Sequence, residues 1–354
     1  MPYDLSALGW TPSRDDEIAP HAARGCVPAR VGAQHRGTYV VHTAPGERPA
    51  EPAGHLLHAA AGAADLPVVG DWVAVHDPPG AAAAVVHAVL PRRSAFSRRA
   101  AGTAVAEQVV AANVDVVLVV TAVGRDLNAR RLERYLAAAW DSGADPVVVL
   151  NKADLADDLD AAVAEAEAVA FGVPVHAVSA VAGTGVDELA GYAAGGRTVA
   201  LLGSSGVGKS SLVNRLLGEE RQAVRDVRSG DSRGRHTTTA RELLPLPGGG
   251  LVLDTPGMRE LGLWDADAGV DRTFADVAEL AAGCRFSDCA HEREPGCAVL
   301  AALADGRLEA ERLESYRKLL RELRHLEVKA DPAARAEQRR RRRRFARSMR
   351  RSAY

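Results

Sequence analysis

The hydrophobic and polar positions follow two different patterns along the chain. Between residues 24 and 98, short apolar runs are separated by turn residues. They predict five strands, at residues 27–31, 38–43, 55–59, 72–76 and 85–90. The Pro- and Gly-rich stretch 45–54 is expected to be a loop between two of them. Five short strands predict a small β-barrel, and the OB-fold is the commonest barrel of that size.

After residue 113, apolar runs alternate with segments of helical periodicity. Strands are expected at residues 115–120, 146–150, 173–178 and 198–202. Helices are expected at residues 129–140, 186–193 and 209–217. This alternation predicts a parallel α/β sheet. Residues 242–246 and 251–253 then predict a hairpin around three glycines, and the chain from 266 onward is expected to be mainly helical.

These patterns divide the 354 residues into five expected segments. Residues 1–23 are polar and without periodicity, which predicts a loose leader. The barrel is expected over residues 24–100, the α/β domain over 101–262 and a helical domain over 263–334, followed by a basic tail at 335–354. A chain of this length suits several domains, at roughly 100–200 residues for each.

Composition and charge indicate a soluble protein with an unusual C-terminus. Hydrophobic residues make up 47% and charged residues 25%, as in ordinary globular proteins. The net charge of −2 combines +9 over residues 335–351, where ten Arg accompany one Glu, with −11 over the remainder. No apolar run reaches about 18 residues, and no basic stretch followed by an apolar one opens the chain. We therefore expect a cytoplasmic protein that does not enter a membrane.

A glycine-rich motif follows the strand expected at 198–202. It matches G-x-x-x-x-G-K-[ST] between a strand and a helix, the context that a phosphate-binding loop requires. Backbone N–H groups of such a loop surround phosphates, while Lys209 is expected to bridge the β- and γ-phosphates and Ser210 to ligate Mg²⁺. A turn that merely caps a helix would not need the Lys-Ser pair. The predicted nucleotide contacts are Gly203, Ser204, Ser205, Gly206, Val207, Gly208, Lys209, Ser210 and Ser211.

A second phosphate-side element is expected at Asp254-Thr255-Pro256-Gly257, directly after the apolar run 251–253. An acid at the carboxyl end of a strand reaches Mg²⁺ through water. Gly257 is expected to offer its N–H group to the γ-phosphate. By itself, this motif is an ordinary turn after a strand. Together with the phosphate-binding loop, it predicts a nucleoside triphosphate site.

Two further motifs indicate which base is bound. Asn151-Lys152-Ala153-Asp154 and Ser179-Ala180 each follow an expected strand, and they resemble the N-K-x-D and S-A motifs of GTPases. The Asp154 carboxylate accepts two hydrogen bonds from guanine that adenine does not offer, so such a site rejects ATP by roughly 10⁴-fold. Asn151 is expected to steady the loop, and the stem of Lys152 to stack on the base. Ser179 is expected to belong to the base-binding loop, and Ala180 to donate its backbone N–H to the guanine oxygen.

Three of the four Cys residues cluster with a His near the C-terminus. In a cytosolic protein, such a cluster favours a metal over disulfides. Three thiolates and one imidazole suit a closed tetrahedral site, so we expect one structural Zn²⁺. The alternative is a set of unrelated reduced thiols. The predicted ligands are Cys284, Cys289, His291 and Cys297.

The order of the motifs is unusual, because N-K-x-D and S-A precede the phosphate-binding loop that comes first in most GTPases. The domain at 101–262 is therefore expected to be circularly permuted, which moves the termini without changing which elements meet. With the barrel, the Cys/His cluster and the basic tail, nearly the whole chain resembles the RsgA (YjeQ) family of GTPases that depend on the small ribosomal subunit. The resemblance implies hydrolysis of GTP to GDP and phosphate, stimulated by that subunit, during its late assembly and rRNA maturation.

The catalytic residue is expected in the charged, Gly-punctuated stretch 218–240. Many GTPases orient the attacking water with a Gln after the D-x-x-G glycine, but Met258 stands there and a thioether cannot do so. His236 is expected to take that role, because an imidazole accepts a proton near neutral pH and the resemblance implies the same. The alternative is a solvated loop histidine. Thr238 is the second expected Mg²⁺ ligand, although its neighbours Thr237 and Thr239 would serve equally by sequence.

Basic segments indicate a polyanionic partner. The tail either binds RNA and orders on binding, or stays solvated and attracts polyanions without specificity. A second basic stretch is either a nucleic-acid face of the barrel or a soluble rim, and comprises Arg92, Arg93, Arg98 and Arg99. We expect a monomer that acts on the small ribosomal subunit and its rRNA. The alternative is an RNA-binding module with GTP as a slow regulatory ligand, whereas a small-molecule phosphotransferase lacks any acceptor-site feature.

Overall fold

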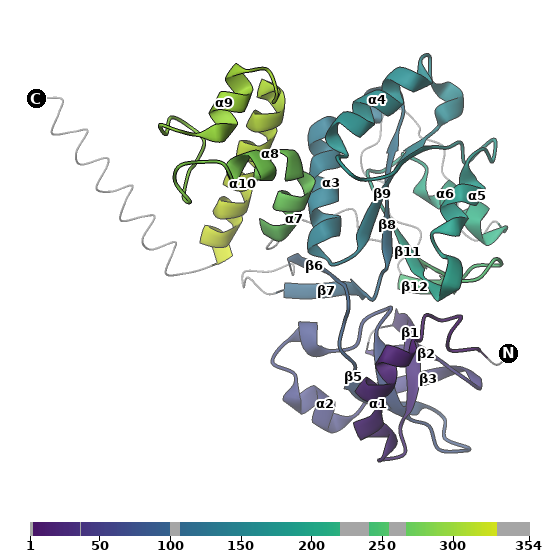
Figure 1. The fold of residues 1–354 in the computed structure, drawn as a ribbon. Coiled ribbons are helices and arrows are strands. Elements are labelled where there is room, and N and C mark those ends of the chain that lie inside the picture. Colours follow the sequence, from purple (N-terminus) through teal and green to yellow (C-terminus); the bar gives the residue numbers. More distant parts are fainter. Residues whose placement is uncertain (1–2, 36, 100–106, 220–240, 255–266, 331–354) are drawn as a thin grey trace, which may run out of the picture.

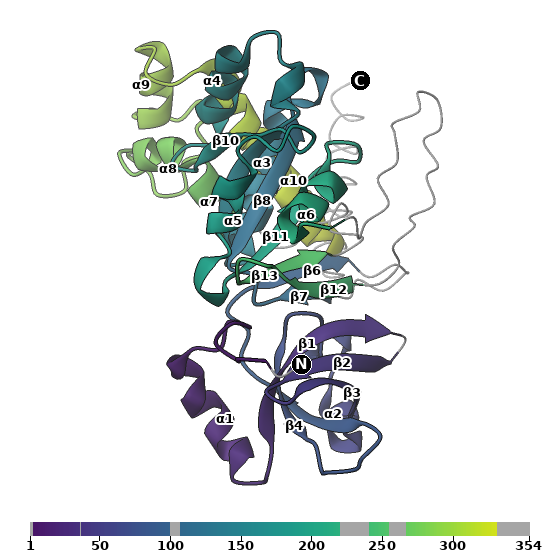
Figure 2. The ribbon, with the colours of Figure 1, turned by 90° about the vertical axis from the view of Figure 1, so that its right-hand side faces the viewer.

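The structure is a computed structural model that describes residues 3–35, 37–99, 107–219, 241–254 and 267–330. It contains a barrel of strands, a central sheet with helices on both faces, and a group of C-terminal helices (Figure 1). The barrel lies at one end of the central sheet, beside strand β12, as the side view shows (Figure 2). The C-terminal helices lie against helix α3 of the central sheet (Figure 1).

The N-terminal barrel is closed by five strands. They pair in the order β1–β2–β3–β5–β4 and back to β1, with only β3 and β5 parallel. Small and β-branched side chains such as Val31, Val41 and Val73 fill its interior. The prediction of an OB-fold-like barrel is confirmed. Its strands are β1 (Val27–His35), β2 (Thr38–Thr43), β3 (Gly46–Pro52), β4 (Trp72–His76) and β5 (Ala84–Val89).

One strand and one loop of the barrel were assigned wrongly from the sequence. Residues 55–59, expected to be a strand, lie in helix α2 (Gly54–Ala59), and the expected loop 45–54 contains β3. The polar β3 is a strand because its backbone pairs with β2 on one side and β5 on the other, while only Gly46 and Ala50 are buried. An apolar pattern therefore does not reveal it. A 3₁₀ turn, η2 (Ala63–Asp65), follows α2.

The N-terminal segment is folded, so the prediction of a loose leader is wrong. It contains a 3₁₀ turn, η1 (Pro12–Arg14), and helix α1 (Asp15–Ala22). Leu8 and Ile18 belong to the largest hydrophobic core, and the Arg14 side chain is 2% exposed and reaches Asn113. These few contacts are irregularly spaced and distant in sequence, which is why no local periodicity predicted them.

The central sheet has the strand order β10–β9–β8–β11–β13–β12. All neighbouring strands are parallel except β12, which forms the expected antiparallel hairpin with β13. The predicted parallel sheet is therefore confirmed. Its strands are β8 (Val116–Ala122), β9 (Asp145–Asn151), β10 (Val175–Ala177), β11 (Thr198–Leu202), β12 (Arg241–Pro245) and β13 (Leu251–Asp254).

Helices cover both faces of the central sheet. Alternate residues of a strand point to opposite faces, so Val117 packs in the core with α3 and α4, while Leu118 packs in the core with α5 and α6. This two-sided burial explains the continuous apolar runs of the sequence. The helices are α3 (Ala129–Asp141), α4 (Leu159–Val169), α5 (Val186–Gly191) and α6 (Lys209–Leu217), with 3₁₀ turns η3 (Gly124–Asp126), η4 (Ala153–Leu155) and η5 (Ala194–Gly196).

Three elements of this region were not predicted. Helix α4 is rich in Ala and weakly amphipathic, so its periodicity was not recognised. Strands β6 (Ala95–Arg99) and β7 (Glu107–Ala112) form a separate antiparallel pair where the barrel meets the central sheet. Strand β12 also pairs with the end of β1, which joins the barrel and the central sheet into one sheet of eleven strands.

The C-terminal helices form a small unit with its own core. Its apolar side chains, such as Phe274 and Leu313, pack together and against Ala137 of α3. The expectation of a mainly helical C-terminal part is confirmed over residues 267–330. The helices are α7 (Asp267–Thr273), α8 (Ala275–Ala281), α9 (Ala298–Ala304) and α10 (Ala310–Ala330).

Candidate functional site

The predicted nucleotide motifs follow strands of the central sheet at the same edge. Asn151 ends β9, Gly203 follows β11 and Asp254 ends β13, while Ser179 lies two residues after β10. Because these strands are parallel, their carboxyl ends meet at one edge, where ligands bind in open α/β sheets. The fold thus brings together motifs that are spread along the chain from residue 151 to residue 254.

The phosphate-binding loop depends on glycine for its shape. Gly203 has φ of 152°, and a Cβ atom there would lie 2.1 Å from the carbonyl oxygen of Val120. Gly208, with φ of 98°, is the N-cap of helix α6, and a Cβ atom there would lie 2.1 Å from Asn151 Nδ2. Lys209 Nζ donates to the carbonyl oxygens of Gly203 (2.7 Å) and Ser204 (2.5 Å). The ammonium group is therefore held against the loop at the N-terminus of α6, and a helix N-terminus favours phosphate binding.

Asn151 joins two of the predicted motifs. Its side chain is buried, its Nδ2 donates to the carbonyl of Val207 at 2.8 Å, and its Oδ1 accepts the Ala180 N–H at 3.1 Å. The prediction that Asn151 steadies the loop agrees with this geometry. The Ala180 N–H, predicted to face the guanine oxygen, is engaged by Asn151 here, so donation to guanine requires sharing or replacing that bond.

The base-recognition residues lie on short turns. Lys152 adopts a left-handed conformation with φ of 62°, which starts the turn η4 and leaves the Asp154 carboxylate exposed. Ser179 is buried, and its Oγ accepts the N–H of Ala182 at 3.0 Å. The exposed carboxylate is available to a base that arrives from solvent, whereas Ser179 shapes its own loop.

Two contacts at this edge were not predicted. Arg215 of α6 donates from Nε to the Ala180 carbonyl (2.9 Å) and from Nη2 to the Val181 carbonyl (2.7 Å), so it ties the S-A loop to the helix behind the phosphate-binding loop. Tyr135 of α3 lies with its hydroxyl 3.4 Å from Ser204 Oγ. Neither residue belongs to a local motif, so the sequence offered no signal for them.

Several predicted site residues lie outside the described residues, namely His236, Thr238 and Gly257. Ser205, Ser210 and Ser211 lie on the described loop and the first turn of α6. The roles assigned to all of these residues remain predictions.

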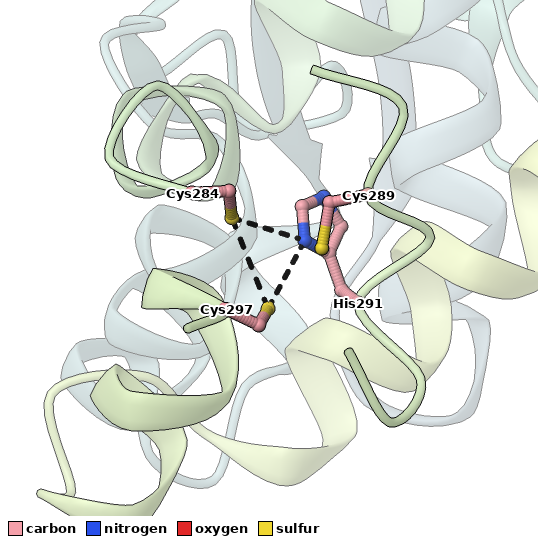
Figure 3. Close-up of side chains that lie close together, drawn as sticks. All are labelled: Cys284, Cys289, His291 and Cys297. Carbon is pink, nitrogen blue, oxygen red and sulfur yellow. Dashed lines mark hydrogen bonds between the residues drawn. The ribbon is translucent and has the colours of Figure 1, made fainter. Parts of the chain in front are cut away.

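The structure brings the four predicted metal ligands together between α8 and α9 (Figure 3). Cys284 Sγ lies 3.8 Å from Cys297 Sγ and 3.6 Å from His291 Nδ1, and the latter lies 3.4 Å from Cys297 Sγ. A tetrahedral Zn²⁺, at about 2.3 Å from sulfur and 2.0 Å from nitrogen, sets its ligands roughly 3.5–3.8 Å apart. All four ligating atoms, including Cys289 Sγ, lie within 4.8 Å of one another.

The chemistry of this cluster also suits a metal. The cysteines are free thiols, and a sulfur separation of 3.8 Å is far too long for a disulfide. Burial lowers the pKa of His291, which favours the neutral imidazole that ligates metals. His291 adopts φ of 56°, so the local backbone is bent to direct this ring into the cluster. The four residues therefore fit a closed zinc site.

A phosphate-binding loop and two guanine-specificity motifs, in permuted order around one edge of a parallel sheet, define a circularly permuted GTPase. A family model described as RsgA GTPase matches residues 89–264. A protein of Opitutus terrae named small ribosomal subunit biogenesis GTPase RsgA is 53% identical over 343 residues, covering 94% of each chain. A protein of the same name from Streptomyces coelicolor is 51% identical over 338 residues, covering 94% of this chain and 90% of its own.

Solved structures agree with this class. YjeQ from Thermotoga maritima superposes with a TM-score of 0.66 at 29% identity, covering 84% of this chain and 98% of that one. YloQ, described as a circularly permuted GTPase, superposes with a TM-score of 0.64 at 24% identity over 85% of this chain and 96% of its own. The chain belongs to the RsgA GTPase family, and its activity is the hydrolysis of GTP. Within the described ranges, no helix is both long and apolar enough to cross a bilayer.

Proposed function

We propose that this GTPase binds the small ribosomal subunit and its rRNA during late assembly of the subunit, as a cytoplasmic monomer, and that the subunit stimulates its GTP hydrolysis. The main support is the near full-length identity of 53% to a protein named for small ribosomal subunit biogenesis. The ten Arg at 335–351 add a segment suited to RNA phosphates. The GTP cycle then times binding to the subunit and release from it.

The described residues support nucleotide binding through backbone donors and one cation. N–H groups of the loop 203–208 face the phosphates, and Lys209, already held at the loop, neutralises charge on the β- and γ-phosphates. Ser210 and Thr238 would hold Mg²⁺, with Asp254 reaching it through water, and the ion supplies positive charge at the phosphate oxygens. Asp154 selects guanine.

Water positioning is assigned to His236, because Met258 offers no suitable hydrogen-bonding group at the position of the usual Gln. Turnover by the isolated protein is then slow, since orientation of the water is a large part of what a protein contributes to phosphoryl transfer. A partner that orders the stretch around His236 accelerates the reaction. Zn²⁺ at the Cys/His cluster is assigned a structural role, because four protein ligands leave no position for water.

The partner is tested by measuring GTP hydrolysis by the protein alone, with small subunits, and with large subunits at matched Mg²⁺. Stimulation by small subunits only is expected. Tight binding of small subunits without any rise in rate would instead favour an RNA-binding module in which GTP is a slow regulatory ligand.

The catalytic assignment is tested by His236→Ala, with His58→Ala on the exposed face of helix α2 as the matched control. We expect subunit-stimulated turnover to fall by roughly 10²–10⁴-fold, the usual contribution of general acid–base groups, while GTP affinity is kept. Full stimulated turnover in the His236 variant would exclude this role.

Base recognition is tested by Asp154→Asn, with the exposed Asp157→Asn as control. Xanthine carries a carbonyl where guanine carries its exocyclic amine, so a carboxamide pairs with it. We expect GTP affinity to fall by at least roughly 100-fold and xanthosine triphosphate to become the better ligand. Unchanged preference for GTP would remove Asp154 from the base site.

A further inference from the structure

A polar cavity lies at the amino ends of the central strands, at the opposite edge of the sheet from the nucleotide motifs. Its volume is about 160 Å³, well above the roughly 15 Å³ that one water needs. The N-terminal segment, the barrel and the starts of β8, β9 and β11 all contribute to its wall. Its charged lining comprises Arg14, Arg30, Arg93, Arg197, Asp115 and Asp145.

Arg30 brings a buried positive charge that no carboxylate contacts. Its side chain is buried, and the described residues place no carboxylate oxygen within salt-bridge distance of it. Its Cζ lies 5.4 Å from the Trp72 ring centre, which adds a cation–π contact without neutralising the charge. Its hydrogen-bond acceptors are three carbonyls and a hydroxyl, of Leu8, Gly70, Asn113 and Thr198. A buried guanidinium without a counter-ion is costly.

Arg14 and Arg93 add further positive charge at the same cavity. Arg14 pairs with Glu17, yet its buried Nε has no partner among the described residues. Arg93, at the exposed mouth, donates to the hydroxyls of Thr11 and Ser13. Burial lowers the pKa of Arg30 to about 10; the charges of Asp115 and Asp71 oppose this shift, whereas the Arg14 charge adds to it. The three guanidinium groups therefore repel one another around one space.

The acids of the cavity do not balance these cations. Asp145 pairs with Arg197 at 3.6 Å and Glu17 pairs with Arg14, which leaves Asp115 to offset both Arg30 and Arg93. Asp115 is exposed, and its Oδ2 accepts the backbone N–H of Thr198 at 2.7 Å. An anion inside the cavity would offset the excess positive charge and accept hydrogen bonds from guanidinium groups.

We infer that this cavity binds one oxyanion of the phosphate type, between the guanidinium groups of Arg14, Arg30 and Arg93. The site is separate from the nucleotide edge, because its walls are the amino ends of the same strands whose carboxyl ends carry the nucleotide motifs. Its place at the junction of three parts of the chain means that the anion would stabilise their arrangement. The phosphate is either free in solution or part of a polynucleotide that reaches the mouth.

The test is equilibrium dialysis of radiolabelled inorganic phosphate against the full-length protein in chloride buffer. A non-hydrolysable GTP analogue and Mg²⁺ saturate the nucleotide site, so that its γ-phosphate position is filled. We expect saturable binding of one phosphate per chain, competed by sulfate and weakened about tenfold or more by Arg93→Ala, since one charge-assisted contact is lost. Arg24→Ala, an exposed arginine of the barrel outside the cavity, is the matched control and should bind as the wild type does.

Absence of saturable binding, or equal binding by the Arg93 and Arg24 variants, would overturn the inference. Arg93 is exposed, so its replacement leaves the core intact, and thermal unfolding of the variant without phosphate checks this directly. Oligouridylate, which does not enter a guanine site, separates the two sources of phosphate. Its displacement of the label from the wild-type protein assigns the cavity to a polynucleotide, and retention of the label assigns it to the free ion.

Discussion

The central sheet is joined to its two neighbours in different ways. At the barrel, strand β1 pairs with β12 through Ala33–Glu242 and Gln34–Arg241, and the buried Arg30 donates to neutral acceptors. At the C-terminal helices, Glu133 and Arg134 of α3 form ion pairs with Arg312 and Glu322 of α10. Apolar side chains pack at both junctions, but strand pairing is found at the barrel junction and ion pairs at the helical junction.

The helical junction is centred on Arg312, which is nearly buried. It donates to Glu133 of α3 at 2.9 Å and to Asp276 of α8 at 2.9 Å, and its guanidinium lies 4.2 Å from the Phe274 ring centre. A second pair, Arg134–Glu322 at 2.6 Å, is more exposed. Loss of one charge should therefore loosen the helical junction, whereas the barrel junction has no comparable single ion pair among the described residues.

The largest effect is expected from loss of the proposed Zn²⁺. Structural Zn²⁺ contributes on the order of 10 kcal/mol to the folding of small domains, and the C-terminal unit has only a small core of its own. Cys297→Ser should abolish hydrogen-exchange protection in residues 267–330 while β8 and β11 stay protected. Cys26→Ser, a buried thiol outside the cluster, is the control. Intact protection in metal-free protein would show that the helices and their ion pairs suffice.

Arg312→Met should cost about 3–5 kcal/mol in unfolding free energy, because it leaves Glu133 buried and unpaired. Chemical denaturation at pH 7 measures this cost. Glu133→Gln in the same chain should recover most of it, since the uncompensated charge is removed. A loss that Glu133→Gln does not repair would mean that packing on Phe274, rather than charge, holds the junction.

The pH dependence of the Arg312 variant follows from the same pair. Burial raises the pKa of Glu133, and the Arg312 charge opposes that rise, so the variant should raise it further. A folded-state pKa above the unfolded value means that stability is present at low pH and is lost as pH rises through the folded pKa. The variant should therefore regain stability as pH falls from 7 toward the normal pKa of Glu.

In the central sheet, which lies between the two junctions, Asn151→Ala should weaken GTP binding by about 10–100-fold. The substitution removes the acceptor of the Ala180 N–H and the donor to the Val207 carbonyl. Each backbone group left without a partner costs about 1–3 kcal/mol. Calorimetric titration with GDP and a GTP analogue measures this. Asn128→Asp, which preserves the N-cap of α3, is the control. Wild-type affinity in the Asn151 variant would show that the two loops hold their shape independently.

The smallest effect is expected for Arg134→Ala at the exposed part of the helical junction. Exposed ion pairs contribute about 1 kcal/mol or less, and salt screens them. Thermal unfolding should therefore show a slightly lower melting temperature for the variant than for the wild type at low salt, and no difference between them at about 1 M salt. A cost as large as that of Arg312→Met would mean that the junction acts as one network.

The sequence alone indicated the nucleotide motifs and the Cys/His cluster, because their chemistry needs particular residue types at short spacings. Gly203 to Ser210 and the cluster from Cys284 to Cys297 are each complete within 14 residues or fewer. The parallel strands were also predicted, because burial on both faces leaves continuous apolar runs such as residues 116–120. The order of the motifs by itself indicated the circular permutation.

The tertiary structure decided what depends on contacts between distant residues. The polar strand β3 exists because β2 and β5 pair with it, and the N-terminal segment is ordered because Leu8 and Arg14 reach buried partners far along the chain. Arg215, the ion pairs of Arg312 and the arginine-lined cavity likewise join residues that no local pattern relates. Local spacing encodes the chemistry of a motif, whereas the joining of domains depends on which surfaces meet after folding.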